Sequence, residues 1–277
     1  MPRTTKKNAE SANHAVAVGE RICNLVPSRG ITTDWTLGDA MAVGALTAVP
    51  LPSSVDLRAP WWEVGDQGGT GSCVGWATGD GLMRFHLVKA GLMRKDQHIS
   101  PRYVWMGSKE TDEFTTRPES FIERSGTSLK AAVDLCRKHG VVTTDLLPFA
   151  LEDSLYAGPE NAFWAAAAQL RATSYFNIGL DIERWKVAVA QDQPVLCGLV
   201  VDRTWRDATE TGGELDEFDV GSAGGGHAVC AVGYRSDGRI ILRNSWGTSW
   251  GDQGFAYASP EYLQAAFFPE AYVVTVR

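Results

Sequence analysis

The pair Asp237-Gly238 constrains the fold of this chain more than any other short motif, because it separates two apolar segments that favour strands. The segments are His227–Tyr234 and Arg239–Asn244. Glycine adopts the positive φ that tight hairpin turns require, so an Asp-Gly pair between two such segments is a strong signal for antiparallel pairing. We therefore predict a β-hairpin over residues 227–244.

The length of the hairpin loop decides which residue lies opposite His227. A two-residue loop places His227 opposite Thr248, and a four-residue loop places it opposite Trp246. In both registers Asn244 faces the same side as His227, either two or four residues away, because side chains alternate along a strand. We expect Asn244 to lie near His227 unless a β-bulge shifts the register.

The rest of the chain divides into a helical part followed by a strand-rich part. We expect helices from Cys73 to about Ala90, from Ser100-Pro101 onward, and over residues 128–139, 160–171 and 181–191. We expect further strands over residues 195–201, 255–258 and 271–276. This order predicts an α+β fold with a helical subdomain over residues 51–180, a β-rich subdomain over 181–277 and a site in the cleft between them.

Residues 1–50 precede these two subdomains as an N-terminal extension. The first 20 residues are polar, and we expect them to lack regular structure. The extension could pack permanently on the body, lie in the cleft as a short inhibitory segment, or tether the chain to a partner.

Composition limits the classes of partner. The net charge is −7 and no Lys/Arg stripe stands out, so we expect no nucleic-acid partner. No run of about 18 apolar residues exists, so we expect no membrane span. The basic N-terminus is not followed by an apolar run, so we expect no secretory signal and a cytoplasmic location. Export by a route without a signal peptide is compatible with the same features.

The 5 cysteines are scattered, odd in number and without a CxxC pair. This pattern favours free thiols in a reducing compartment and no zinc site, and we expect neither metal nor cofactor. Cys73 differs from the others because it follows a glycine-rich loop and opens a predicted helix. A helix N-terminus favours negative charge, so we expect the pKa of this thiol to be lowered. Gln67 has an amide donor close enough in sequence to reach the same site.

Thiol, imidazole and amide together are the parts of a cysteine-nucleophile site. An imidazole takes the thiol proton and stabilises a thiolate, and a side-chain amide fixes the tautomer of the imidazole. The motifs that carry these groups resemble the papain family of cysteine peptidases. They are Gln67, Gly71-Ser72-Cys73, His227-Ala228-Val229, Gly233-Tyr234 and the highly specific stretch Asn244-Ser245-Trp246-Gly247-Thr248-Ser249-Trp250-Gly251-Asp252-Gln253-Gly254. The resemblance covers residues 51–277 and begins at Leu51–Arg58, which is similar to the start of the mature enzyme.

The resemblance implies a role for each site residue. Cys73 would be the nucleophile, His227 its base and Asn244 the residue that orients the imidazole. Gln67 would donate in the oxyanion hole, and Trp246 would shield the hydrogen bond between His227 and Asn244. The resemblance also implies a roomy specificity pocket for a bulky apolar side chain, lined by Gly126, Ser128, Gly198 and Ala228.

The chain departs from the family pattern at two positions beside the nucleophile. Thr70 stands where the family has a disulfide-forming cysteine, and Val74 stands where it has an aromatic residue. We expect a cysteine endopeptidase that hydrolyses a peptide or protein substrate through a thioester intermediate. A cysteine-dependent deamidase or transamidase acting on a protein, and a catalytically silent papain-like binding module, are the alternatives.

Overall fold

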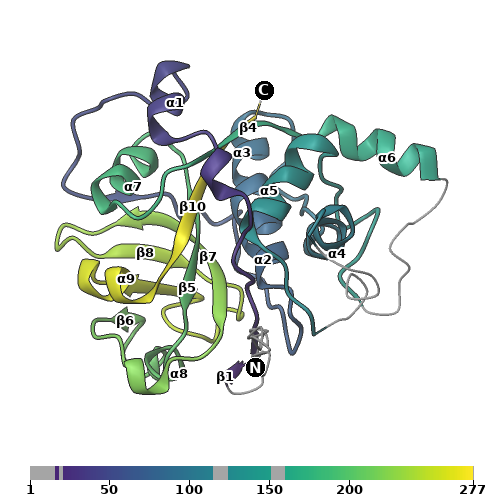
Figure 1. Ribbon diagram of the computed structural model, residues 1–277. Helices are drawn as coiled ribbons and strands as arrows, with labels where there is room; N and C mark the ends of the chain where they lie inside the picture. Colours follow the sequence, from purple (N-terminus) through teal and green to yellow (C-terminus); the bar gives the residue numbers. More distant parts are fainter. Residues whose placement is uncertain (1–15, 19–20, 115–123, 151–159, 277) are drawn as a thin grey trace, which may run out of the picture.

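The computed structural model describes residues 16–18, 21–114, 124–150 and 160–276. The helices of residues 73–169 cluster in one half, and the large sheet occupies the other half together with the remaining helices, as an α+β fold (Figure 1). The N-terminal segment, drawn in purple, runs between the two halves (Figure 1).

The helical elements follow the chain in this order: η1 Ile31–Thr33, α1 Leu37–Ala42, α2 Cys73–Gly75, η2 Trp76–Met83, α3 Arg84–Lys89, α4 Pro101–Thr111, α5 Leu129–Lys138, α6 Glu160–Gln169, α7 Ile182–Val189, α8 Thr204–Asp207, η4 Val220–Ser222 and α9 Pro260–Ala266. The strands are β1 Val16–Val18, β2 Arg21–Cys23, β3 Val55–Asp56, β4 Ala172–Asn177, β5 Val195–Val200, β6 Glu214–Leu215, β7 Gly226–Tyr234, β8 Ile240–Arg243, β9 Phe255–Ala258 and β10 Phe267–Val276.

Most of the helices and strands expected from the sequence are present. The hydroxyl oxygens of Ser100 and Ser128 accept the N–H groups of Tyr103 and Ala131 at 3.1 and 3.2 Å, which caps α4 and α5. The expectation that the first 20 residues lack regular structure is wrong at Val16–Val18, which pairs with β2 as a two-stranded ribbon. Residues 1–15 and 19–20 lie outside the described residues.

The large sheet has the strand order β4-β10-β5-β7-β8-β9-β6, with β3 paired to β7. Every residue of β7 is buried because both faces of the sheet are covered. Ala228, Cys230 and Val232 face a core that they share with the helical half. The alternate residues Val229 and Ala231 face a second core formed with α7 and α9. β4 comes from within residues 51–180, so the sheet draws a strand from the range expected to be helical.

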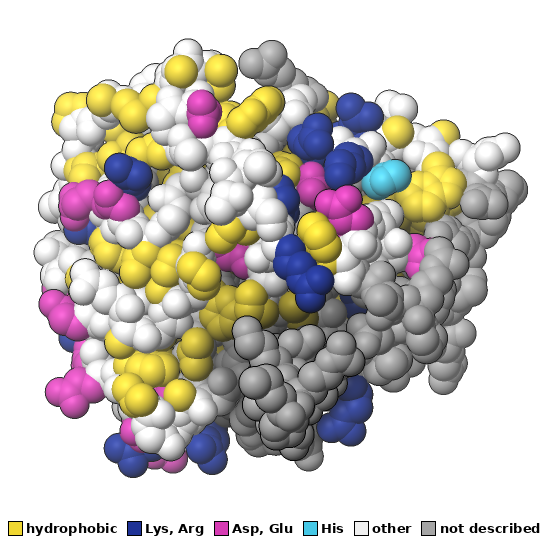
Figure 2. Space-filling model, viewed as in Figure 1, with side chains coloured by type: hydrophobic (Ala, Val, Ile, Leu, Met, Phe, Trp, Pro, Cys, Tyr) yellow, Lys and Arg dark blue, Asp and Glu magenta, His cyan; other side chains and the backbone are white. Residues whose placement is uncertain are grey.

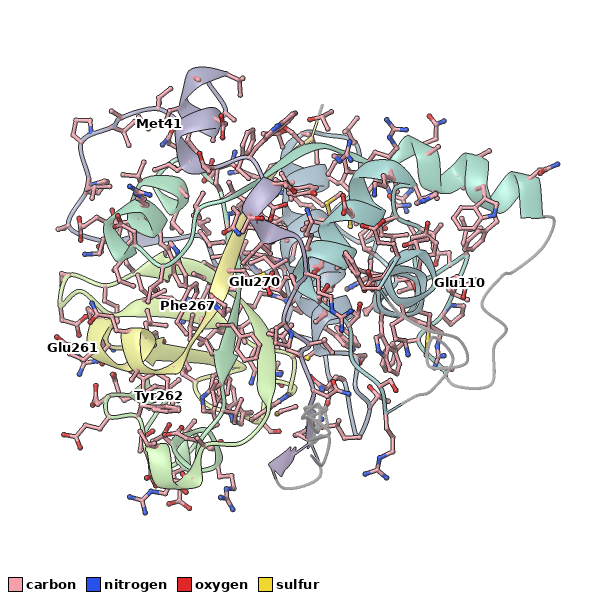
Figure 3. All side chains as sticks on the ribbon, in the orientation of Figure 1. Met41, Glu110, Glu261, Tyr262, Phe267 and Glu270 are labelled. Carbon is pink, nitrogen blue, oxygen red and sulfur yellow. The ribbon has the colours of Figure 1, made fainter. Side chains whose placement is uncertain are left out.

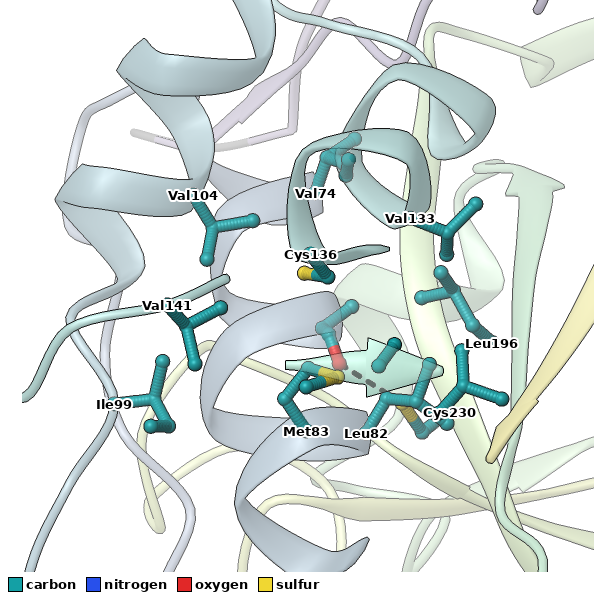
Figure 4. Close-up of a cluster of buried hydrophobic side chains, with 14 of the residues drawn as sticks. Val74, Leu82, Met83, Ile99, Val104, Val133, Cys136, Val141, Leu196 and Cys230 are labelled. Atoms are coloured by element: carbon teal, nitrogen blue, oxygen red, sulfur yellow. Dashed lines mark hydrogen bonds between the residues drawn. The ribbon is translucent and has the colours of Figure 1, made fainter. Parts of the chain in front are cut away.

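The helix that begins at Cys73 passes through the first core. Its middle turns, η2, are a π-helix, a form that is frequent at functional sites. Val74, Leu82 and Met83 point into a cluster with residues of α4, α5 and the sheet (Figure 4). Glycine is needed where neighbours approach most closely: a Cβ at Gly75 would collide with the Pro101 carbonyl, and one at Gly81 would lie 2.8 Å from the Cys230 sulfur.

The described residues contain no helix long and apolar enough to cross a membrane. On the face shown in Figure 2, lysine and arginine side chains are interspersed with acidic ones. On α5, for example, Asp134 forms ion pairs with Lys130, Arg137 and Lys138.

Replacing Gly75 with alanine tests this close packing. We expect Gly75→Ala to destabilise the protein by roughly 1–3 kcal/mol, because the added Cβ meets backbone that cannot rotate away. Gly79→Ala is the matched control: its Cβ would lie 3.2 Å from methyl groups of Ile99 and Val104, which can shift. Urea unfolding followed by tryptophan fluorescence measures both. A Gly75→Ala variant as stable as the wild type would contradict the packing described here.

Candidate active site

Cys73 is the first residue of α2 and its side chain is completely buried. Burial raises the pKa of its thiol because the thiolate loses hydration, while backbone hydrogen bonds from Ala228, Val74 and Asn24 act in the opposite direction. The expectation that the helix N-terminus lowers this pKa is therefore wrong for the covered state seen here. The contact with Ala228 brings the sulfur against β7 next to His227, since the two residues are consecutive.

His227 and Asn244 meet as the sequence predicts. Nε2 of His227 lies 2.7 Å from Oδ1 of Asn244, and the same oxygen accepts the backbone N–H of Ser245 at 2.8 Å. An amide oxygen only accepts, so Nε2 carries the proton of the neutral ring and Nδ1 keeps a lone pair. Among the described residues Nδ1 has no hydrogen-bond partner. The imidazole is thus held in the tautomer that can accept a proton at Nδ1.

The electrostatic setting of His227 favours its neutral form. Burial lowers its pKa to about 4; the hydrogen bond to Asn244 raises it, and the charge of Arg21 lowers it. With the pKa of Cys73 raised, both groups are neutral in this state. A thiolate–imidazolium pair therefore requires that water or a substrate replace the protein groups that bury these two side chains.

A β-bulge sets the geometry between His227 and Asn244. Neither predicted loop length is correct: the N–H of Arg235 donates to the Arg239 carbonyl at 2.8 Å, which leaves a three-residue loop with Gly238 at φ 93°. Continued without interruption, this register would place His227 opposite position 247 and turn Asn244 to the other face. The extra residue Val232 shifts the pairing by one.

After the bulge Cys230 lies opposite Arg243, so the same register continued places His227 opposite Trp246. Asn244 then shares the face of His227. The bulged segment is fixed from its other side by β3, because the Leu57 N–H donates to the Val232 carbonyl at 2.9 Å.

Gln67 is completely buried and its amide is oriented by the strand that carries Asn244. Its N–H donates to the Ser245 carbonyl, and Ser245 Oγ donates to its Oε1, each at 2.9 Å. The side-chain Nε2 consequently points away from Ser245 and donates to the Thr70 carbonyl at 3.0 Å and the Ile22 carbonyl at 3.2 Å. This orienting role of Ser245 was not predicted from the sequence.

Two tryptophans contact the imidazole, and a third packs on both of them. The ring centroid of Trp246 lies 4.9 Å from that of His227, and Trp205 approaches edge-on at 5.4 Å. Trp250 stacks on Trp205 at 5.3 Å and donates its Nε1–H to the Trp205 carbonyl at 2.7 Å. Trp205 was missed from the sequence, because it stands on the four-residue helix α8 with no motif around it.

Residues 21–28, here called the cleft segment, cover this site. The Arg21 guanidinium binds the Asp66 carboxylate and donates to the Trp246 carbonyl at 3.2 Å. The next carbonyl, of Ile22, is the group that accepts from Gln67. These contacts place residues 21 and 22 of the extension against the site, an arrangement that fits both permanent packing on the body and an inhibitory segment.

The cleft segment continues in extended form between the two halves. The Leu25 N–H donates to the Gly226 carbonyl at 2.8 Å, and the Val26 N–H donates to the Thr127 carbonyl at 3.1 Å. The Asn24 side chain binds the Arg124 carbonyl. The segment therefore joins the residue before His227 to the helical half through its own main chain.

Buried polar groups hold the end of the cleft segment and the residues that follow it. The Ser28 N–H donates to Oε1 of Glu270 at 2.9 Å, and its hydroxyl accepts the Lys130 N–H at 3.0 Å. Asp34 binds the Lys130 ammonium and accepts from the Tyr272 hydroxyl at 2.8 Å. Glu270 lies where the purple segment passes β10 (Figure 3). Burial raises the pKa of its carboxyl.

The four residues predicted to line the specificity pocket lie along the cleft segment or beside it. A Cβ at Gly198 would collide with the Leu25 side chain, and one at Gly126 would collide with the Asn24 carbonyl. Ala228 belongs to the same buried cluster as Leu25. Ser128 uses its hydroxyl to cap α5. In the described residues no three His, Cys, Asp or Glu side chains gather as they would for a metal ion.

Comparison with known proteins places this geometry in a family. The family model of papain family cysteine proteases matches residues 51–265. Cathepsin B-like CP3 of Giardia intestinalis is 28% identical over 229 residues, which are 78% of this chain and 72% of that protein.

Solved structures share the fold. Xylellain, a cysteine protease from Xylella fastidiosa, superposes with a TM-score of 0.75 and 21% identity over 99% of this chain and 100% of that chain. Digestive procathepsin L 3 of Tenebrio molitor superposes with a TM-score of 0.61 and 20% identity over 82% of this chain and 71% of that chain. The chain therefore belongs to the papain family of cysteine proteases, and it is a cysteine peptidase.

Proposed function

We propose that this chain is an endopeptidase in which Cys73 is the nucleophile, His227 the general base and acid, and Asn244 the residue that orients the imidazole. The 2.7 Å contact between Nε2 of His227 and Oδ1 of Asn244 carries the proposal. It supports the tautomer whose Nδ1 can take a proton from a thiol.

The reaction begins when the cleft opens to substrate. Nδ1 of His227 takes the thiol proton, and the Cys73 thiolate attacks the carbonyl carbon of the scissile peptide bond. The resulting oxyanion accepts hydrogen bonds from the Cys73 N–H and from Nε2 of Gln67. His227 then protonates the leaving amine. A water molecule that His227 deprotonates hydrolyses the thioester and regenerates the thiol.

Deamidation or transamidation of a protein would use the same groups. Peptide hydrolysis is favoured because the cleft binds an extended main chain through backbone groups of Gly226 and Thr127, which suits a polypeptide substrate. A silent binding module is disfavoured because each reacting position carries a competent side chain. The Leu25 side chain against Gly198 supports a preference for aliphatic side chains at that subsite.

We also infer that the cleft segment inhibits the enzyme while it is seated. Its Ile22 carbonyl takes the Gln67 amide that the oxyanion would need, and it covers Cys73 and His227. The neutral state of thiol and imidazole supports the same view, since a neutral thiol is a poor nucleophile.

Removing the Gln67 amide tests the oxyanion role. In enzyme whose cleft segment has been displaced, we expect Gln67→Ala to lower kcat/KM by about two to three orders of magnitude and leave the fold intact. Gln264→Ala, at an exposed position on α9, is the matched control. Hydrolysis of a fluorogenic peptide measures both, with circular dichroism as the check on folding. A loss smaller than about tenfold would contradict the assignment.

Loosening the anchors of the cleft segment tests inhibition. We expect the double variant Arg21→Ala, Asp34→Asn to alkylate faster with iodoacetamide at Cys73 and to hydrolyse peptides faster, because the two ion pairs that hold the segment are lost. Thr32→Ala, at an exposed position of the same extension, should behave as wild type. Peptide mass mapping assigns the alkylated cysteine. Equal labelling of Cys73 in all three proteins would refute inhibition by the segment.

Acid should favour the open cleft. The seated segment keeps His227 neutral, with its pKa lowered to about 4, so proton uptake below its ordinary pKa of 6.5 stabilises the open state. The inhibited state is therefore favoured at high pH and weakens as pH falls from 6.5 toward 4. Asp66 also favours the open state as pH falls, because its pKa is lowered while the segment is seated. Glu270 favours the seated state as pH falls, because its pKa is raised there. We expect the protection factors of the Leu25 and Val26 amides in hydrogen exchange to fall by up to roughly a hundredfold between about pH 7 and about pH 4.5.

Two comparisons make this measurement specific. Amides of β5 serve as the internal reference, because they lie in the sheet rather than in the cleft segment. His227→Gln removes the titrating ring, and most of the pH dependence should disappear with it. Protection of Leu25 and Val26 that is independent of pH in the wild type would overturn the coupling.

A further inference from the structure

The cleft segment carries a second cysteine next to the nucleophile. Cys23 is the last residue of β2, and it is completely buried. Cys23 packs against the Gly225 backbone, since a Cβ at Gly225 would collide with the Cys23 carbonyl and lie 3.2 Å from the Cys23 Cβ. It belongs to the same buried cluster as Trp205 and Trp246, the aromatic neighbours of His227. Gly225 stands two residues before His227, so Cys23 lies beside the strand end that presents the imidazole.

The residues on either side of Cys23 contact the loop that leads to Cys73. The Ile22 carbonyl accepts from Nε2 of Gln67 at 3.2 Å, and a Cβ at Gly71 would collide with the Asn24 side chain. Besides burial, the charge of Cys73 contributes to the raised pKa of Cys23. A disulfide needs Cα atoms about 4.4–6.8 Å apart, a range that we expect the segment to reach as it returns over the nucleophile.

We propose that Cys23 and Cys73 form a disulfide when the enzyme meets a hydroperoxide, and that this bond locks the cleft segment over the active site. The proposal rests on the proposed function, since it takes Cys73 as the nucleophile and the cleft segment as its inhibitor. Cys23 is then the second thiol, which converts the oxidised Cys73 to a disulfide. The disulfide makes Cys23 the site of a reversible modification that stores the enzyme in an inactive form.

The chemistry balances in two steps. When the segment lifts, the Cys73 thiolate attacks one oxygen of the hydroperoxide; the O–O bond breaks, the second oxygen leaves as hydroxide or alkoxide, and Cys73 becomes a sulfenic acid. When the segment returns, the Cys23 sulfur attacks the Cys73 sulfur, the S–O bond breaks and water leaves with the thiol proton. Two thiols and one hydroperoxide give one disulfide, one water and one further water or alcohol. A thiol reductant reverses the lock by exchange.

The other cysteines lack such a partner in the cleft segment. Cys136 lies inside α5 among apolar side chains, and Cys230 donates its S–H to the Ala77 carbonyl at 3.1 Å in the same core (Figure 4). Cys197 lies in β5, in the core on the other face of the sheet. These three cysteines belong to α5 and the sheet, which stay in place when the cleft segment lifts away from Gly198 and Lys130.

The experiment treats wild type, Cys23→Ser and Cys136→Ser with more than two equivalents of hydrogen peroxide, because oxidation of one thiol to the sulfinic acid consumes two. The remaining thiols are then blocked with iodoacetamide, and the protein is digested with trypsin. In wild type and in Cys136→Ser we expect peptide Ile22–Arg29 joined to peptide Ala59–Arg84, two hydrogen atoms lighter than the separate peptides together. Cys23→Ser cannot form this product, and its Cys73 should proceed to the sulfinic acid.

Activity gives an independent readout after dithiothreitol. Wild type and Cys136→Ser should regain peptide hydrolysis. The hydrolysis rate of oxidised Cys23→Ser should stay at least about tenfold lower than the rate of the same variant before oxidation. Absence of the cross-linked peptide in wild type, or full recovery of Cys23→Ser, would overturn the lock. The mass of the cross-linked peptide tests the disulfide. Peptide hydrolysis by the reduced, unoxidised wild type tests the proposed function. A failure of the disulfide proposal is therefore distinguishable from a failure of the proposed function.

Discussion

The β-bulge at Val232 is the constraint on which the site depends. The three-residue loop at Gly238 by itself would turn Asn244 away from His227, and the one-residue shift in β7 returns it to the same face. The hydrogen bond between the imidazole and the amide follows from that register. It also brings Ser245 into position to orient Gln67, so one irregularity in one strand aligns both His227 and Gln67.

Burial gives this arrangement its electrostatic character. The cleft segment removes water from Cys73 and His227, which raises the pKa of the thiol and lowers that of the imidazole. The same pair exposed to water or substrate would exchange a proton readily. In the proposed function, inhibition and catalysis are two hydration states of one pair of side chains, and the cleft segment selects between them.

The cleft segment is held mainly by its backbone and by a few buried charges. Its main chain bonds to Gly226 and Thr127, while Glu270 and Asp34 fix Ser28 and the residues beyond it. The carboxylates among these anchors depend on protonation state and ion pairing, whereas the backbone hydrogen bonds do not. The disulfide that we propose between Cys23 and Cys73 would add a covalent means of holding the cleft segment.

Much of the body could be predicted from local sequence, because serine caps, strand alternation and the glycine that ends α5 act over a few residues. The meeting of His227 with Asn244 was also foreseen, although for a loop of the wrong length. The π-helical middle of the central helix and the aromatic contact from Trp205 were not, since both arise from packing between distant segments.

The sequence by itself determined the papain fold, the pair His227 and Asn244 on one hairpin, and a thiol at the start of a closely packed helix. Only the tertiary structure decided the register between β7 and β8, the orientation of the Gln67 amide and the buried, neutral state of the Cys73 thiol. The physical reason is that hairpin propensity and capping are local, whereas a bulge, a desolvated sulfur and a segment seated across a cleft depend on atoms far apart in the chain.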